Sequence, residues 1–313
     1  MKALLRLLVS AAILAFLVRK FGAAEVMSRL LASDWRWVVA GLAAFSVGQL
    51  VSSLRFVWAL ESLGRRIGFG ESTRVHYVGL WFNQVLPTSM GGDVVKVLLL
   101  KPAYGMSRAV RATLLDRLSG YLFLAFAMAL CLPLYFGHFP SPYPGWFAAT
   151  VAFGTAAGVA VLVAGARSGP VRRRFPARVR GILLFILDIP RFLRGGYLWR
   201  QLGSSAVVHL SGVASFWALS TSLGVHATFV EHLLLVPLIF LVALVPVSFA
   251  GWGLRETGAI GLYGLVGIAA TDALAVSLLF GFVLVLAALP GGVAWLLSPR
   301  KPGNFRSKQA AGT

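Results

Sequence analysis

A short stretch in the first half of the chain places two charged residues beside helix-breaking residues. LPTSMGGDVVK, over residues 86–96, contains a proline, two adjacent glycines, Asp93 and Lys96, and apolar residues run up to it on both sides. A helix that restarts after such a break exposes backbone N–H groups at its N-terminus, which carries roughly half a positive charge. The glycines let a ligand approach that backbone, and Ser89 adds a hydroxyl donor. These residue types at this spacing indicate a binding site for an anion.

A second stretch in the other half of the chain has similar chemistry. PVSFAGWGLRE, over residues 246–256, also runs from Pro-x-Ser through glycines to an acidic residue, here Glu256, which follows Arg255. Apolar segments that are interrupted by Gly and Pro at corresponding places of two halves are typical of transporter binding sites. The two stretches together therefore predict one binding site that both halves contribute to.

The ionisable residues near the two breaks are the candidates for ligand binding, because such residues are costly within membrane segments and usually functional. The cations Lys96, Arg117 and Arg255 would hold an anion, and the acidic residues beside them would position the cations or exchange protons. Asn83 and Gln84 either satisfy backbone groups that the break leaves free or touch the ligand. The predicted binding residues are Ser89, Gly91, Gly92, Asp93, Lys96, Arg117, Ser248, Gly251, Arg255 and Glu256, supported by Asn83, Gln84, Pro87, Asp116, Pro246 and Gly253.

Each charged group also has a purely structural interpretation. Asp93 can cap the helix that follows the first break. Asp116 and Arg117 can anchor the cytoplasmic end of their helix, and Arg255 with Glu256 can form a pair that allows the second broken segment to insert. The sequence alone leaves these alternatives open.

The composition indicates an integral membrane protein. Of 313 residues, 58% are hydrophobic and 12% are charged, whereas a soluble domain carries about a quarter charged residues. The net charge is +19, but the basic residues lie mostly between apolar segments, where they set orientation and meet lipid headgroups rather than nucleic acid. Cys131 is the single cysteine and the five histidines are scattered. We therefore expect no metal, no cofactor and no catalytic residue, since nucleotide-binding and hydrolase motifs are also absent from the sequence.

Apolar runs of nearly spanning length recur along the chain. A spanning helix needs about 20 apolar residues, and residues 76–86 and 93–100, on either side of the first break, are each too short. Basic residues flank both, which favours a re-entrant hairpin whose loop lines a cavity. We expect an all-α polytopic membrane protein with about seven or eight transmembrane helices and one or two re-entrant hairpins. The helices are expected at 3–18, 35–60, 112–136, 146–166, 203–224, 232–249, 256–270 and 273–297.

Basic residues also predict the orientation and the division of the chain. Residues 167–202 are rich in arginine and would be cytoplasmic by the positive-inside rule. This segment would join two halves, at about 1–166 and 203–299, of one transmembrane domain over 1–299, with a possible inverted repeat. A basic tail over 300–313 would follow, and both termini would be cytoplasmic.

The first apolar segment has the basic start and apolar core of a signal peptide. Arg19 and Lys20 follow its apolar core directly, which opposes cleavage, so we expect a retained helix. In the orientation given above, Arg19, Lys20, Arg29 and Arg36 would face outward, against the positive-inside rule.

Three motifs in this order resemble a known family. The stretch ending at Asp93, the pair Asp116–Arg117 and the stretch ending at Glu256 resemble, over nearly the whole chain, the membrane region of lysylphosphatidylglycerol synthases. That region also occurs alone, in flippase-like bacterial and archaeal proteins. The resemblance implies movement of a lipid between leaflets. The family often has a basic residue soon after the Gly-Gly pair, whereas here Asp93 follows directly and Lys96 would fill that role. The sequence shows no counterpart of the synthases' aminoacyltransferase domain, so we expect a stand-alone member.

The expected function is that of a lipid translocase in the bacterial inner membrane rather than an enzyme. It would bind the anionic headgroup of a phospholipid or of a polyprenyl-phosphate-linked lipid between the two re-entrant loops. Two alternatives are a membrane-embedded enzyme of lipid or glycan-lipid biosynthesis and a non-catalytic scaffold of a lipid-modifying complex. The sequence does not indicate the lipid, the driving force or the oligomeric state.

Overall fold

A computed structural model describes most of the chain as helices. It covers residues 2–86, 90–139, 142–143, 145–152, 156, 160, 185, 188–189, 192, 196–243, 248 and 250–297. Within these residues there is no strand, which confirms the predicted all-α class. The helices are α1 (Lys2–Lys20), α2 (Ala23–Leu31), α3 (Trp35–Ser62), α4 (Phe69–Val85), α5 (Gly91–Tyr104), α6 (Met106–Leu130), α7 (Leu132–His138), α10 (Gly196–Ser222), α11 (Phe229–Ala243), α12 (Leu254–Gly264) and α13 (Ala270–Leu296).

Four of these helices are long and apolar enough to cross a membrane: α3, α6, α10 and α13. Large apolar side chains on their outer surfaces, such as Phe126 and Phe282, are more than half exposed, as expected where lipid replaces water. The apolar helix α11 is shorter, with 15 residues. The chain is a polytopic membrane protein, and seven or eight spans remain a prediction, since much of the expected helix over 146–166 lies outside the described residues.

The two helices around the first break are longer than the apolar pattern predicted. α4 begins at Phe69 rather than near 76, and α5 continues to Tyr104 rather than 100. The extension has a local cause, because Gly68 precedes α4 and Glu71 lies in its first turn, where a carboxylate favours the positive end of the helix. A search for apolar runs omits such polar first turns. The re-entrant path of this pair remains a prediction.

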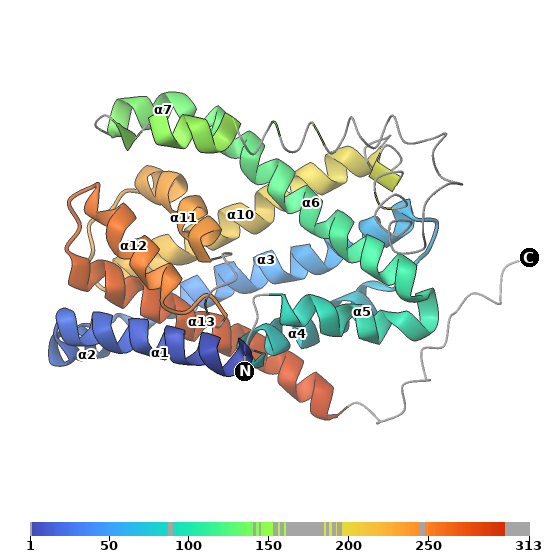
Figure 1. The fold of residues 1–313 in the computed structure, drawn as a ribbon, viewed down its shortest axis with the longest axis horizontal. Helices are drawn as coiled ribbons and strands as arrows, with labels where there is room; N and C mark the ends of the chain where they lie inside the picture. The colour runs from blue at the N-terminus through green and yellow to red at the C-terminus, as the bar shows by residue number, and fades with distance from the viewer. Residues whose placement is uncertain are drawn as a thin grey trace, which may run out of the picture.

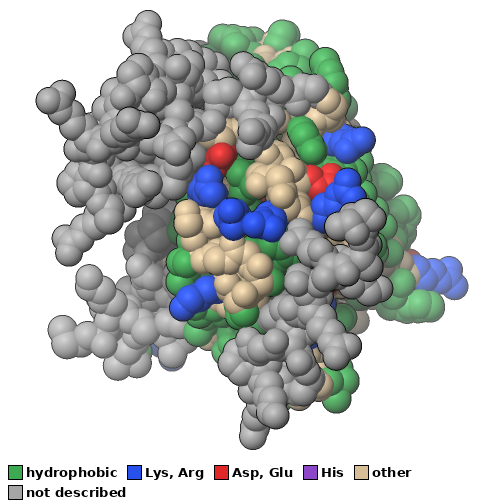
Figure 2. Space-filling view, turned by 90° about the vertical axis from the view of Figure 1, so that its right-hand side faces the viewer, with side chains coloured by type: hydrophobic (Ala, Val, Ile, Leu, Met, Phe, Trp, Pro, Cys, Tyr) green, Lys and Arg blue, Asp and Glu red, His purple; other side chains and the backbone are tan. Residues whose placement is uncertain are grey.

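Figure 1 shows α3 in the middle of the molecule, with α4 and α5 towards one end and α11 and α12 towards the opposite end. The end of the molecule at which α3 ends and α6 begins carries exposed basic residues, among them Arg66, Lys101 and Arg108. Lys and Arg side chains gather on this face in Figure 2.

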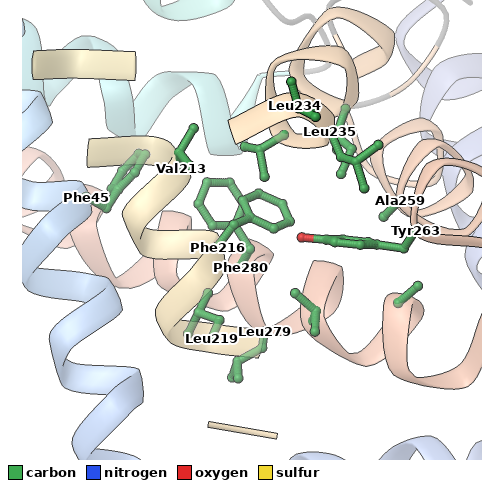
Figure 3. Packing of buried hydrophobic residues seen from close by; sticks show 14 of the residues in the cluster. Phe45, Val213, Phe216, Leu219, Leu234, Leu235, Ala259, Tyr263, Leu279 and Phe280 are labelled. Atoms are coloured by element: carbon green, nitrogen blue, oxygen red, sulfur yellow. The ribbon is translucent and has the colours of Figure 1, made fainter. Parts of the chain in front are cut away.

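The largest apolar core joins α10, α11, α12 and α13 with parts of α6 and α7, and Phe45 reaches it from α3. In Figure 3 the rings of Phe216 and Phe280 lie against each other, and Tyr263 points towards them. The centroids of the Phe216 and Phe280 rings are 4.2 Å apart. This core packs α13 against α10 and so positions the residues that α13 presents towards α3.

Candidate functional site

A cavity of about 370 Å³ lies inside the helical bundle, and both halves of the chain line it. Four cationic and two carboxylate side chains are among the described residues of its wall. Of the predicted site residues, Asn83, Gln84, Gly92, Asp93, Lys96, Asp116, Arg117 and Arg255 line the cavity. Gly91, Ser248, Gly251, Gly253 and Glu256 do not line it, and Pro87, Ser89 and Pro246 lie outside the described residues.

Asp116 is the centre of a buried charge cluster. Its Oδ1 accepts a hydrogen bond from Arg55 Nε at 2.9 Å, and its Oδ2 lies 3.6 Å from Lys96 Nζ. All three side chains are at most 8% exposed. The Lys96 ammonium lies 3.5 Å from the centroid of the Phe56 ring, and Arg55 also donates to Ser205 Oγ at 3.2 Å. Arg55 is therefore fixed by two partners, whereas Lys96 is held more loosely.

A second ion pair is more open. Arg117 Nε donates to Asp93 Oδ2 at 2.8 Å, and the two side chains are 38% and 24% exposed. Asp93 lies in the first turn of α5, whose N-cap position is occupied by Met90. Its carboxylate thus meets both the positive end of the helix and Arg117, rather than capping the helix.

The break between α4 and α5 is closed by Asn83. Its Oδ1 accepts a hydrogen bond of 2.7 Å from the backbone N–H of Gly92, so Asn83 satisfies a freed donor. The neighbouring Gln84 has a buried Oε1 without a hydrogen-bond partner among the described residues. Backbone groups of Gly79 and Gly92 also touch, because neither residue has a side chain.

We expect Gly92→Ala to open this contact. An added Cβ would lie 2.0 Å from the Gly79 carbonyl oxygen and 2.7 Å from Asn83 Oδ1. The overpacking should cost about 1–2 kcal/mol of stability and should misplace Asp93 and Lys96. Thermal unfolding in detergent measures the loss. Gly261→Ala is the matched control, because a Cβ there meets nothing within 4 Å; equal stability of the two variants would contradict the prediction.

The second broken segment ends in a closed network. Glu256 Oε1 accepts from Arg255 Nε at 3.0 Å and from Ser277 Oγ at 3.1 Å, and its Oε2 accepts from the Gly253 backbone N–H. The Arg255 guanidinium lies 4.8 Å from the Trp252 ring centroid. Glu256 is thus fully engaged with neighbouring groups of its own segment and of α13, while Arg255 also reaches the cavity.

Residues 3–292 match the family model described as Lysylphosphatidylglycerol synthase TM region. The chain belongs to this family. No curated protein matches the chain. The match confirms the resemblance seen in the sequence and supports a function in the membrane that involves membrane lipids.

The cavity wall also contains polar residues that the sequence analysis did not select. Gln49 and Arg55 on α3, His76 on α4 and His209 on α10 all line the cavity. Gln49 and Arg55 lie within an otherwise apolar spanning helix, and polar residues in that context are a usable signal. His209 gave no such signal, since one histidine on an apolar helix is commonly structural.

The described residues contain no cluster of histidine, cysteine and acidic side chains that could hold a metal ion. The cations of the cavity attract an anion. Its neutral polar groups can form hydrogen bonds with other parts of the same ligand.

Proposed function

We propose that the protein binds the anionic headgroup of a membrane lipid in this cavity and moves the lipid between leaflets. The observation that carries the proposal is that three cations from different parts of the chain line one cavity. They are Lys96 of the first broken segment, Arg117 of α6 and Arg255 of the second broken segment. Arg55 brings the number of lining cations to four, against two lining carboxylates. A surplus of positive charge inside an apolar bundle favours an anionic ligand.

Lys96 is the cation best suited to bind a lipid phosphate. Its ammonium is 3.6 Å from Asp116, and that carboxylate keeps its closer bond to Arg55 when Lys96 turns away. Lys96 can therefore exchange Asp116 for a ligand without leaving a buried carboxylate unpaired. Arg55 would keep its bond to Asp116, and Lys96 would turn from Asp116 to bind the ligand.

The carboxylates at the two broken segments and on α6 are all engaged with cations. Asp93 is paired with Arg117, Asp116 with Arg55 and Lys96, and Glu256 with Arg255 and Ser277. Each of these groups thus accepts a bond from, or lies beside, a cation, which fits a role in holding the cations in place. The pairings also give Asp93 and Glu256 the task of organising the cations.

The exposed basic face in Figure 2 supports an orientation with that end of the bundle in the cytoplasm. The proposal accordingly places the protein in a bacterial cytoplasmic membrane, with both termini inside.

We expect Lys96→Gln to slow transbilayer movement of an anionic lipid at least tenfold. Purified protein would be reconstituted in vesicles that contain acyl-labelled phosphatidylglycerol or a labelled polyprenyl phosphate, and access of the label to a membrane-impermeant quencher would be followed. Lys101→Gln, an exposed cation on the same helix, is the matched control and should move lipid at the wild-type rate.

Movement of neither lipid by the folded wild-type protein would overturn translocation. Equal rates for Lys96→Gln and Lys101→Gln would show that the cavity is not the route of the lipid. Chemically altered lipid in the same vesicles would favour the enzyme alternative, and unchanged function after loss of the cavity charges would favour the scaffold.

A further inference from the structure

The helices of the two halves begin or end at positions that are separated by a constant number of residues. Helix α3 ends at Ser62 and α10 at Ser222, 160 residues later, and Leu-Gly follows in both cases. Gly64 and Gly224 both adopt positive φ, at 72° and 68°. The pairs continue at the same spacing: α4 and α11 begin at Phe69 and Phe229, Glu71 and Glu231 lie in their first turns, and α5 and α12 end at Tyr104 and Gly264.

The two long helices related by this spacing, α3 and α10, pack against each other in opposite directions. Gly41 approaches Ser215 and Leu219, and Gly48 approaches Val208 and Ser211. Further along α3, Arg55 bonds Ser205. Partner numbers on α10 thus fall as numbers on α3 rise, so equivalent helices run antiparallel. Figure 1 agrees, because α4–α5 and α11–α12 lie towards opposite ends of the molecule.

The close approach at Gly48 lies next to one equivalent pair, Gln49 and His209, which are 160 residues apart. Both residues line the cavity. Other lining residues form equivalent pairs at the same spacing: Leu80 with Phe240, Asn83 with Ala243, Gly120 with Phe280 and Leu124 with Leu284. The cavity is therefore built around the place where the two copies of the unit cross.

Gln49 and His209 have complementary free groups. His209 Nδ1 lies 2.8 Å from the Ser205 carbonyl oxygen, which only accepts, so Nδ1 carries the hydrogen and Nε2 of the neutral ring is an acceptor. Gln49 Oε1 is bonded to His76 Nε2 at 3.0 Å, which leaves the amide N–H groups as donors. Among the described residues, neither His209 Nε2 nor the Gln49 amide nitrogen has a hydrogen-bond partner.

We propose that residues 35–130 and 195–290 form an inverted repeat, and that Gln49 and His209, at its axis, bind a hydroxyl group of the lipid headgroup. A hydroxyl accepts from the amide N–H of Gln49 and donates to Nε2 of His209, which uses both free groups. This inference rests on the proposed function and narrows its substrate class. The ligand is a phosphate ester whose alcohol part carries a free hydroxyl, as in glycerol or sugar phosphates.

The remaining wall argues against a headgroup that carries an ammonium. An ammonium only donates, so it could use the His209 acceptor but not the Gln49 donors. It would also need a free carboxylate, whereas Asp93 and Asp116, the two that line the cavity, are already paired with cations. Arg55 lies beside His209, since a Cβ added at Gly120 would meet both side chains. A second cation at that point would be repelled.

The test compares two lipids that differ only in hydroxyl groups. Phosphatidylglycerol and phosphatidylpropanol have the same phosphodiester charge and the same three-carbon chain in the alcohol part, but the second has no free hydroxyl. Stabilisation of the detergent-solubilised protein by each lipid gives its apparent affinity. We expect wild type to bind phosphatidylglycerol about tenfold more tightly, and His209→Leu and Gln49→Leu to bind both lipids equally, at the wild-type affinity for phosphatidylpropanol. His209→Gln, which retains an acceptor near the position of Nε2, should recover part of the preference.

Equal affinity of wild type for the two lipids would overturn the hydroxyl contact, as would a preference that survives in both leucine variants. Because binding is measured without transport, a protein that binds selectively but moves no lipid would refute the proposed translocation and leave this inference standing. Soluble glycerol phosphate is a third probe. Stabilisation as strong as by phosphatidylglycerol would support the hydroxyl contact and assign the site to a soluble phosphate ester rather than to a lipid.

Discussion

Asp116→Asn should destabilise the protein by about 3–5 kcal/mol, because it leaves Arg55 and Lys96 buried around a neutral side chain. Asp116 is the acidic partner of both cations, at 2.9 Å from Arg55 and 3.6 Å from Lys96. Their side chains are 8% and 4% exposed, so little water is available to replace the lost carboxylate. The free energy of unfolding, measured by titration with a denaturing detergent, gives the effect.

Asp93→Asn is the matched comparison. It removes the same charge from a pair whose side chains are 38% and 24% exposed, and exposed pairs contribute at most about 1 kcal/mol. A second replacement, Lys96→Met in the Asp116→Asn background, should recover part of the loss by removing one unpaired cation. Equal destabilisation by Asp116→Asn and Asp93→Asn would show that the buried cluster is not what stabilises the bundle.

The sequence predicted the positions of the breaks and most of the charged residues at the site. Pro and Gly within apolar runs mark points where a membrane helix must stop, so residues 86–96 and 246–256 were recognisable. Ionisable residues within such runs are rare, and Lys96, Arg117 and Arg255, which were selected on this ground, line one cavity. Their role in ligand binding remains a prediction. The family resemblance, carried by the same residues, was confirmed by the match over residues 3–292.

The sequence did not indicate which charged residues on different helices form ion pairs with each other. Asp93 bonds Arg117 rather than a neighbour in the chain, and Asp116 bonds Arg55 on another helix. In a soluble helix an apolar stripe shows which face is buried. Lipid is as apolar as the protein core, so α3 gives no such stripe, and the helices that its polar residues Arg55 and Gln49 meet could not be inferred.

The same lack of a buried stripe makes small residues the main indicators of helix contacts in this fold. Gly291 on α13 is the extreme case. A Cβ added there would lie 1.8 Å from the carbonyl oxygen of Tyr77 on α4, which is backbone and cannot turn away. The next residue, Gly292, faces the ring of Trp81, with 3.0 Å between its added Cβ and the nearest ring atoms. The backbones of α4 and α13 therefore meet only because glycine occupies this point.

Gly291→Ala should force α4 away from α13 and should cost at least the upper end of the ~1–3 kcal/mol range for overpacking. Because α4 carries His76, Asn83 and Gln84 to the cavity, binding of phosphatidylglycerol should fall together with the melting temperature. Gly203→Ala on α10 is the control, since an added Cβ there meets nothing within 4 Å and alanine favours a helix. If Gly291→Ala unfolds at the same temperature as Gly203→Ala, the two helices are not in backbone contact. Loss of lipid binding at unchanged stability would instead show that α4 moves as a unit and positions the site without supporting the fold.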